Sequence, residues 1–401
     1  MIENEPWMQT DAVIVVCAGL AFTGAVANVA WRQACGLSRR RPVCLITDGL
    51  SPERRQQLQQ GPQLRLQLLR VPGFRALRRF GHLPHQLVWT LRALQALAQQ
   101  VKPGEPATVI CHSHLVAALI GLWFGRRRLR LLMISHGDPR RRPPGTYGPG
   151  VLWLYRLCAG PAHRRAAVSV ALSPAMAAAI RGHGVDDRRI ALIPNGLDPA
   201  EIGLQEPPAT PSAHWTTRPL RLLFVGRLDA VKGVEVLLDA LQLAQRQGAA
   251  LHLALIAPAT SRQSRDLRQA IAERGLSSTV DPLGPRPRGT LAAHYLSCHA
   301  LVVPSLDDPL PTVVLEAMAC GRPVIASAVG GIPFQLQQGD CGLLVPPGDP
   351  EALAAAILRL DQDRGLAADL AKRALQRSQA FSWQANVQAL QAVLKPAADG
   401  S

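Results

Sequence analysis

Short apolar runs rich in β-branched residues alternate with longer amphipathic segments along most of this 401-residue sequence. Residues 88–100 (VWTLRALQALAQQ) are typical of the amphipathic, helical segments. Because strands buried on both faces have nearly continuous apolar sequences, the alternation indicates βαβ units and parallel sheets. The runs expected to form strands are residues 13–17, 42–47, 64–71, 108–112, 130–137, 168–173, 191–196, 221–226, 251–257, 300–305 and 323–328.

A proline-rich stretch divides this alternation into two series. LQEPPATPSAHWTTRP (204–219) is typical of an interdomain linker, and the chain is too long for one compact core. We therefore predict an α/β protein with two Rossmann-like doubly wound domains, residues 1–203 and 220–380, that face each other across a cleft. Residues 381–401 are expected to form a helix that packs back on the N-terminal domain.

The basic charge is confined to the N-terminal half. Residues 1–200 contain 26 Lys and Arg against 10 Asp and Glu, whereas residues 201–401 contain 18 of each. Such an imbalance fits an anionic partner: a phospholipid surface, an acidic acceptor or nucleic acid. A genome that favours arginine codons is the alternative explanation. Most of the excess arginine lies in residues 70–81, 125–130 and 138–150.

Within residues 70–81, Phe74, Leu77 and Phe80 interleave with arginines, a pattern suited to an anionic membrane surface or to a solvated helix with a few core residues. Nucleic-acid binding is not expected, because aromatic residues make up only 4% of the chain and no recognition motif is found. The hypothesis is peripheral association of the N-terminal domain with an anionic membrane.

Residues 12–31 form an uncharged run long enough to span a bilayer. Acidic rather than basic residues precede this run, unlike a signal peptide, and its glycines after Val13–Val16 are typical of a strand, a turn and a helix. The eight cysteines include no CxxC pair, so neither a zinc site nor a disulfide framework is predicted. We therefore expect a cytoplasmic protein, with peripheral contact at the inner face of the membrane.

The strongest functional signal is SLDDPLPTVVLEAMACGRPVIAS (305–327). A short helix over residues 312–320 is expected, and its first backbone amides would form a ready site for a diphosphate. Glu316 could accept two hydrogen bonds from a ribose diol, and Asp308 in the preceding loop could reach a sugar. The general preference for acids near helix N-termini is the alternative explanation for both residues.

The segment GRLDAVKG (226–233) brings two cations to the same edge of the sheet. Arg227 leaves a strand end and Lys232 opens the next helix, where open α/β sheets bind ligands. Together they would neutralise a diphosphate leaving group. Because side chains supply this charge, no metal ion or other cofactor is expected.

These segments resemble, in the usual order, blocks of the retaining GT-B glycosyltransferases of family 4, which carry a Glu-x7-Glu signature. The resemblance covers nearly the whole chain and is most specific over residues 190–357. It implies a nucleoside-diphosphate sugar, such as a UDP-sugar, as donor, an N-terminal domain that binds the acceptor, and a role in polysaccharide or cell-envelope biosynthesis. The resembling blocks are VGRLDAVKG, IPNGLD, DDPLPTVVLEAMACGRPVIAS and VGGIPFQLQQGDCGLLVPPGDPEALAAAI.

By the position of these blocks, the resemblance implies that Glu316 holds the ribose, Arg227 and Lys232 the diphosphate, and Asp308 the sugar hydroxyls. His112 matches the family's histidine near the transferred sugar. The remaining residues implied to bind the donor are Thr312, Val313, Gly24, Asn195 and His136.

Three positions depart from the family pattern. Asp308 replaces the usual first Glu and is one methylene shorter, Phe334 replaces an acid after GGIP, and Thr23-Gly24 replaces two glycines. We interpret the Phe334 position as structural. His114, a third histidine at the strand ends, is less favoured for a site role than His112 and His136.

The expected reaction is transfer of a hexose to a hydroxyl acceptor, lipid-linked or anionic, with retention at the anomeric carbon. Three alternatives stay open: a sugar-nucleotide epimerase or phosphorylase on the same fold, a basic nucleic-acid-binding protein, and a non-catalytic homologue.

Overall fold

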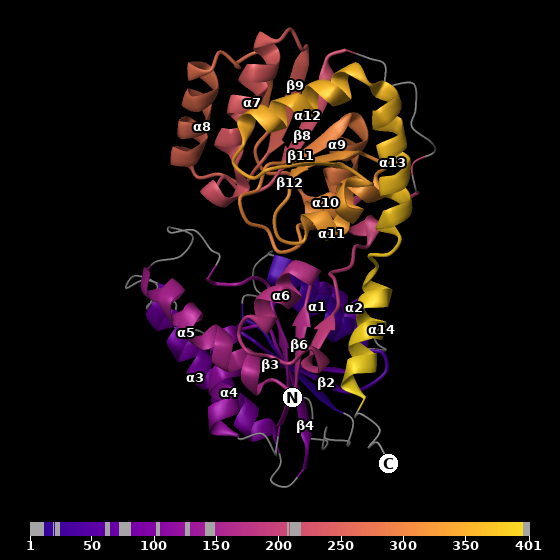
Figure 1. Ribbon diagram of the computed structural model, residues 1–401. Helices are drawn as coiled ribbons and strands as arrows, with labels where there is room; N and C mark the ends of the chain where they lie inside the picture. Colours follow the sequence, from indigo (N-terminus) through magenta and orange to yellow (C-terminus); the bar gives the residue numbers. More distant parts are fainter. Residues whose placement is uncertain are drawn as a thin grey trace. The chain divides into compact units, whose positions relative to one another are not determined.

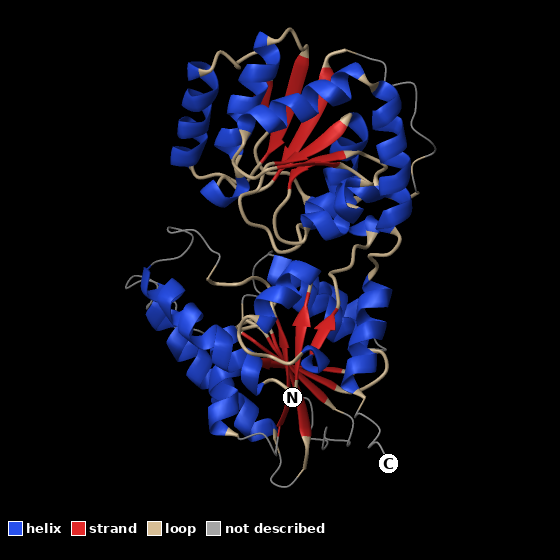
Figure 2. Cartoon of the chain, viewed as in Figure 1, coloured by secondary structure: helices blue, strands red, loops and turns tan. Residues whose placement is uncertain are grey.

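The structure of the protein is a computed structural model that forms two compact units. Unit 1 comprises Met1–Asn195 and Trp383–Ser401, and unit 2 comprises Gly196–Ser382. Figure 1 traces the chain through both units and Figure 2 shows their helices and strands. The residues that the structure describes are 12–18, 20, 25–60, 65–71, 82–101, 105–124, 129–140, 149–206, 208 and 218–395.

Unit 1 contains a seven-stranded parallel sheet with the order β3-β2-β1-β4-β5-β6-β7. The register along β1 pairs Val13 with Val43 of β2 and with Thr108 of β4. The strands are β1 (Val13–Val16), β2 (Val43–Thr47), β3 (Leu66–Arg70), β4 (Ala107–Cys111), β5 (Leu129–Ile134), β6 (Val168–Ala171) and β7 (Ile190–Leu192).

Alternate residues of β1 enter two different cores, because successive side chains of a strand point to opposite faces. Val13 and Val15 pack with α1 and α14, whereas Ile14 and Val16 pack with α3 and α4. Both faces of the sheet are therefore covered by helices, which explains why its strands read as continuous apolar runs. The helices of unit 1 are α1 (Ala25–Ser38), α2 (Pro52–Gln60), α3 (His82–Gln100), α4 (His114–Trp123), α5 (Pro149–Arg165), α6 (Pro174–Arg181) and α14 (Trp383–Leu394).

Unit 2 repeats this plan with a six-stranded parallel sheet of order β10-β9-β8-β11-β12-β13. Leu222 of β8 packs with α7 and α12, and its neighbour Leu223 packs with α10 on the other face. The strands are β8 (Leu220–Val225), β9 (Leu251–Ile256), β10 (Val280–Pro282), β11 (Ala300–Val303), β12 (Val324–Ser327) and β13 (Leu343–Val345). The helices are α7 (Val234–Arg246), α8 (Ser261–Glu273), α9 (Leu291–Ser297), α10 (Thr312–Ala319), α11 (Ile332–Gln335), α12 (Pro350–Gln362) and α13 (Arg364–Ser378).

The boundary between the units differs from the expected one. Residues 196–206 belong to unit 2 rather than to the N-terminal domain, because Leu197, Ile202 and Leu204 bury their side chains in its core. The expected linker 204–219 therefore begins inside unit 2, and of its remaining residues the structure describes 205, 206, 208, 218 and 219. At the other end of the chain, α14 belongs to unit 1, where Leu390 and Leu394 join the core beside α1.

The uncharged run of residues 12–31 is divided between β1 and the start of α1. Among the helices of the described ranges, none is long and apolar enough to cross a membrane.

Close packing of α14 on α1 depends on Gly36. A Cβ atom at this position would overlap Cγ2 of Val387 and lie 3.1 Å from its Cγ1. Val387 is β-branched and stiff at χ1, so it cannot turn away freely.

We predict that Gly36→Ala destabilises the protein by about 1–3 kcal/mol, the usual cost of overpacking a filled contact. Alanine is otherwise the better helix former by about 1 kcal/mol, so the clash has to exceed that gain. Urea unfolding of the full chain measures the difference.

The double variant Gly36→Ala/Val387→Ala removes the opposing methyl groups and should recover most of the lost stability. A Gly36→Ala protein as stable as the parent would show that α14 does not pack on α1 in this way.

Candidate functional site

The strand order of unit 2 reverses between β8 and β11, which are neighbours in the sheet although two strands separate them in sequence. Open α/β sheets bind ligands at such a switch point, outside the carboxyl ends of the strands. The loops that leave β8 and β11 there contain Lys232 and Asp308, respectively.

Backbone contacts lock these two loops together. The Leu306 amide donates to the carbonyl oxygen of Val231 over 2.7 Å. Gly233 has φ 67°, and a Cβ on it would overlap the carbonyl oxygen of Pro304. Only glycine satisfies both the left-handed conformation and the close approach.

The loop after β12 supports Asp308 from a third side. The Gly331 amide donates to the Asp308 carbonyl oxygen over 3.2 Å. Gly330, at φ 54°, touches the same carbonyl so closely that a Cβ would overlap it. The loops after β8 and β12 therefore fix the backbone of residues 304–308 in the loop after β11.

Lys232 and Asp308 form an ion pair, with Nζ 2.5 Å from Oδ2. The Lys232 side chain is 23% exposed and that of Asp308 is 9% exposed, so the pair is screened from bulk water on most sides. Arg227 does not join this pair. Its Nη2 lies 2.8 Å from Oδ2 of Asp229, and its side chain is largely exposed.

The N-terminus of α10 follows this pair along the chain. Pro311 precedes the helix in an extended conformation, with ψ 125°, and no side chain caps the first turn. The amides of Thr312 and Val313 therefore lie at a helix end of the kind that binds anions. The helix ends at Ala319, one residue before the expected end, and Gly321 follows at φ 60°.

Glu316 is buried in the middle of α10 rather than exposed on its first turn. Its Oε2 accepts a hydrogen bond of 2.8 Å from the Tyr295 hydroxyl, and its Oε1 lies 2.9 Å from Nη2 of Arg288. The simple preference of helix N-termini for acids does not account for such a paired, buried carboxylate. Sequence reasoning missed Arg288 and Tyr295, since neither belongs to the motif and their loop and helix carry no distinctive spacing.

Phe334 has the structural role expected for it. Its ring contacts Phe381 edge to face, with centroids 5.9 Å apart, and the Arg377 guanidinium lies 5.3 Å from its centroid. Phe334 therefore packs the helix α11 against Phe381 and Arg377, at a position where the family pattern has an acid.

In unit 1, two predicted site residues meet at the carboxyl ends of β4 and β5. Nδ1 of His112 lies 2.9 Å from Nε2 of His136, and the rings stack with centroids 5.2 Å apart. One nitrogen of this contact must carry the proton and the other must accept it, so the bond requires at least one neutral ring. Asn195 is buried at the end of unit 1, and Gly24 lies outside the described residues.

Burial keeps these histidines neutral. It lowers the pKa of His136 to about 3 and that of His112 well below the ordinary value, and further lowering comes from His114 for His136 and from His136 for His112. Nε2 of His112 is buried and has no hydrogen-bond partner among the described residues. A neutral imidazole with one unused nitrogen can exchange a hydrogen bond with a hydroxyl without taking up charge.

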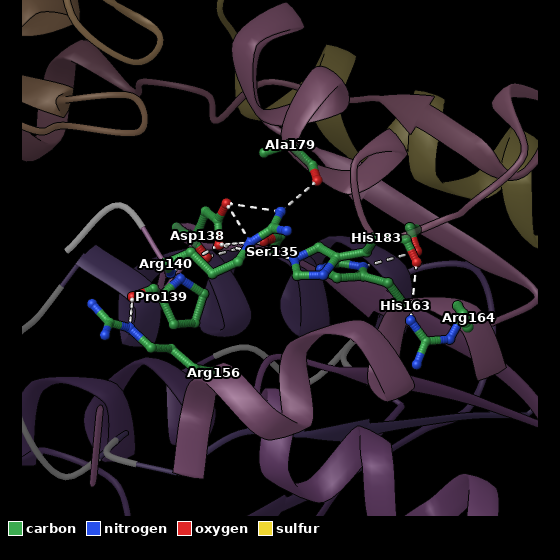
Figure 3. A network of polar contacts seen from close by, with 11 residues as sticks. Ser135, Asp138, Pro139, Arg140, Arg156, His163, Arg164, Ala179 and His183 are labelled. Atoms are coloured by element: carbon green, nitrogen blue, oxygen red, sulfur yellow. Dashed lines mark hydrogen bonds and ion pairs between the residues drawn. The ribbon is translucent and has the colours of Figure 1, made fainter. Parts of the chain in front are cut away.

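Figure 3 shows a second polar network of unit 1. His163 and His183 stack with centroids 5.7 Å apart, and Nδ1 of His163 lies 3.0 Å from the Ser169 hydroxyl. Arg140 extends from Asp138 to the carbonyl oxygen of Ala179, which it reaches over 3.1 Å.

The ionisation states in this network are set by burial and by hydrogen bonds. Burial lowers the pKa of His163 to about 2 and that of His114 to about 4. Burial alone would raise the pKa of Asp138, but the His183 ring, with Nε2 3.8 Å from Oδ1, and hydrogen bonds from Arg140 outweigh it and hold that pKa below its usual range. Within the described ranges, no group of three or more His, Cys, Asp and Glu side chains could hold a metal ion.

The basic segments 70–81, 125–130 and 138–150 fall mostly outside the described residues. The parts of them that the structure does not describe are residues 72–81, 125–128 and 141–148.

Two family models match the chain. The model described as "Glycosyl transferase 4-like domain" matches residues 24–196, and the model "Glycosyl transferases group 1" matches residues 219–363. Together they cover most of both units, and the second match contains the whole β8, β11 and β12 edge described above.

Among the curated proteins, similar chains are D-inositol 3-phosphate glycosyltransferases. That of Corynebacterium jeikeium is 36% identical over 172 residues, 42% of this chain and 41% of the relative. That of Geodermatophilus obscurus is 33% identical over 232 residues, 54% of this chain and 49% of the relative. The matched region thus spans about half the length of the curated relatives.

Solved structures share the fold over nearly the whole chain. Sucrose-phosphate synthase from Thermosynechococcus elongatus superposes with a TM-score of 0.76 at 22% identity and covers 96% of this chain and 98% of its own. The Anabaena protein HepE, in complex with UDP and glucose, has a TM-score of 0.71 at 20% identity and covers 96% and 99%. The GT-B arrangement of two Rossmann-like sheets is therefore the fold of this protein.

We predict that the protein loses stability as the pH falls from about 6.5 to 4. The folded pKa values of His112, His114, His136 and His163 are lowered, so the unfolded chain binds protons in this range that the folded chain does not. Each such histidine adds a slope of about 1.4 kcal/mol per pH unit. Urea unfolding between pH 7.5 and 4.5 measures it.

His163→Asn keeps a nitrogen near Ser169 but cannot titrate. The unfolding free energy of this variant should therefore change less steeply with pH, by about 1.4 kcal/mol per pH unit, the effect of one proton. An unfolding free energy that stays flat over this pH range would contradict the neutral, buried state of the histidines.

Proposed function

Because the chain belongs to the glycosyl transferases group 1 family, we propose that it transfers a hexose from a nucleoside-diphosphate sugar to a hydroxyl acceptor with retention at the anomeric carbon. The observation that carries the proposal is the Lys232–Asp308 pair at the switch point of unit 2, beside the uncapped N-terminus of α10. A cation, free helix amides and a carboxylate in one place suit a sugar diphosphate.

A UDP-sugar is the donor we favour. HepE, whose fold this chain shares, is described in complexes with UDP, with UDP and glucose and with UDP-glucose. The acceptor that we propose carries negative charge, because the names of the curated relatives specify an inositol phosphate and the N-terminal half of this chain is strongly basic. A precursor of a polysaccharide or of the cell envelope fits that description.

The leaving diphosphate would be stabilised by charge and by amide donors. An ammonium group has three N–H donors, and one of those on Lys232 is used by Asp308, so two are available for phosphate oxygens. Arg227 and the amides of Thr312 and Val313 would add further donors. These groups act where charge develops in the transition state, so they accelerate the reaction rather than merely bind donor.

The sugar and the nucleoside would lie on opposite sides of that diphosphate. Asp308 would accept hydrogen bonds from sugar hydroxyls and Glu316 from the ribose. In unit 1, the neutral His112 could exchange a hydrogen bond with a hydroxyl. In a retaining transfer of this kind, the departing phosphate oxygen can take the proton of the acceptor hydroxyl on the same face. No step in this scheme requires a metal ion.

Two enzyme alternatives share this donor site. A sugar-nucleotide epimerase would turn over without acceptor, and a phosphorylase would use inorganic phosphate. A nucleic-acid-binding protein would instead bind RNA without affinity for sugar nucleotides, and a non-catalytic homologue would bind donor without consuming it.

We predict that Lys232→Ala reduces the rate of hexose transfer at least about 100-fold, the scale expected for losing one charge-stabilising contact. UDP-sugars should also raise the melting temperature of the parent protein more than that of the variant. Transfer from a radiolabelled donor and a thermal-shift screen of UDP- and GDP-sugars measure the two effects.

Lys372→Ala removes the same charge from an exposed position on α13 and is the matched control, with rates expected near normal. Product formed with the donor's anomeric configuration, read by NMR, supports retention. Near-normal transfer by Lys232→Ala would contradict the assignment of the site. A product with inverted configuration at the anomeric carbon would contradict the proposed retention.

We also propose that unit 1 associates peripherally with an anionic membrane through α3 and α5. Four of the seven exposed large hydrophobic side chains among the described residues lie on these two helices: Leu87, Leu91, Trp153 and Leu157. The helices are tied together by a 2.6 Å hydrogen bond from Tyr155 to Gln86 and lie on the same side of the sheet (Figure 1).

The charge of these helices selects an anionic bilayer over self-association. Neither sequence contains an acid, while α3 carries Arg92 and α5 carries Arg156, Arg164 and Arg165. A second copy docked on the same face would bring arginines against arginines. An apolar stripe flanked by cations instead suits an interfacial position among anionic headgroups.

We predict that Leu91→Ser/Trp153→Ser lowers partitioning onto vesicles of phosphatidylcholine and phosphatidylglycerol at least about tenfold, because two inserted side chains are lost. Cosedimentation of the full chain measures it. Leu192→Ser changes an exposed leucine of the same unit elsewhere and should bind like the parent. Equal binding by the double variant, or no binding by the parent at low salt, would refute this surface.

A further inference from the structure

The carboxylate of Glu316 is inaccessible in this structure. Its side chain is 1% exposed, and Oε1 has no surface open to solvent. The Tyr295 hydroxyl covers Oε2 and the Arg288 guanidinium covers Oε1. A ribose diol can reach this carboxylate only after one of these two groups moves.

Tyr295 is not the group that can move. Its side chain is completely buried in the core of unit 2 between α9 and α10. Burial, with the neighbouring Glu316 carboxylate, raises the pKa of its phenol well above the ordinary value, so the hydroxyl remains a donor to Oε2. Displacing it would open the core.

Arg288 is the group that can move, because its side chain is 42% exposed. A second acid holds it from the other side: its Nε lies 3.2 Å from Oε2 of Glu201. The backbone reinforces this link, since Gly203 at φ 81° lies so close to the carbonyl oxygen of Gly289 that a Cβ would overlap it.

Glu201 and Glu316 differ in their position relative to the proposed ribose site. The Glu201 side chain is 9% exposed and lies at the start of unit 2, away from the motif that contains Glu316. Arg288 can therefore give up Glu316 and keep Glu201, and its charge stays compensated. The reverse exchange would leave Arg288 covering the oxygen that a ribose needs.

We propose that Arg288 is an exchangeable cover of the ribose site: a bound nucleotide displaces its Nη2 from Oε1 of Glu316, while Glu201 retains the guanidinium beside the ligand. The inference rests on the proposed function, in which Glu316 binds the ribose. Arg288 then lowers the affinity that vicinal hydroxyls contribute, because their contact with Glu316 has to replace the ion pair that is lost.

The experiment compares the affinities of UDP and 2′,3′-dideoxy-UDP for the full chain by calorimetry. In the parent protein, the advantage of UDP is reduced by the cost of displacing Arg288. In Arg288→Ala this cost is absent, so the ratio of the two affinities should rise by about 5- to 30-fold, the range of one partly exposed charge-assisted contact.

Arg286→Ala is the matched control. It removes an exposed arginine two residues earlier in the same loop, and its affinity ratio should equal that of the parent. Arg288→Lys serves as a second variant if Arg288→Ala does not fold, and it should give a smaller rise because an ammonium cannot bridge the two acids as a guanidinium does. A ratio that is unchanged or lower in both Arg288 variants would overturn the proposal.

Glu316→Gln separates this inference from the proposed function. If Glu316 binds the ribose, this variant loses much of the advantage of UDP whatever Arg288 does. A Glu316→Gln protein with the parent's ratio would refute the ribose contact itself. If the ratio of the UDP and 2′,3′-dideoxy-UDP affinities falls in Glu316→Gln but does not rise in the Arg288 variants, only the displacement of Arg288 is refuted.

Discussion

The backbone contact between Gly233 and Pro304 is the constraint on which the unit 2 site depends. It fixes the distance between the loop that leaves β8 and the loop that enters α10, and Lys232 and Asp308 meet as a consequence. A largely buried ion pair gives little net stabilisation, because the desolvation of its two charges offsets most of their attraction, so it could not hold two loops in place. A side chain at Gly233, in contrast, would have to displace a carbonyl oxygen. The site is therefore organised by steric fit, and its charges occupy positions that the backbone sets.

The buried histidines of unit 1 and the buried acids of unit 2 differ in their charge. In unit 1, His112, His136 and His163 avoid charge, because burial lowers each pKa far below neutrality. In unit 2, charge is retained and compensated, as in the contacts of Arg288 with Glu201 and Glu316. A half with neutral imidazoles can offer hydrogen bonds to a hydroxyl without attracting anions at that point, whereas a half with fixed charges can stabilise a leaving anion.

The sequence was sufficient to predict the architecture and the loops of the site. Long, regular apolar runs identified eleven of the strands. Two were missed: β10 (VDP) contains an acid and a proline, and β13 (LLV) is a run of only three apolar residues between Gly342 and Pro346. The early start of unit 2 was also missed, since burial of Leu197 and Ile202 depends on packing partners far along the chain.

Within the site, the motif placed Lys232, Asp308 and the α10 N-terminus in one region. It gave no indication that Arg227 pairs with Asp229 or that Glu316 is covered. These outcomes depend on side-chain directions and on Arg288, a residue 28 positions before Glu316 in a loop without a motif. Spacing along a chain predicts which loops converge at a sheet edge, but it does not predict which acid a long, flexible arginine selects.

The basic half of the chain cannot neutralise itself. Residues 1–200 hold 26 Lys and Arg and only 10 Asp and Glu, so complete one-to-one pairing would still leave a large positive excess. Several of its arginines bind backbone carbonyl oxygens: Arg130 donates to Val393 and Leu394, and Arg156 to Pro139. Such bonds satisfy the donors of a guanidinium and order its side chain, but a carbonyl carries no net charge to compensate it. The field of this half therefore extends into solvent, and binding of an anion would lower its electrostatic energy.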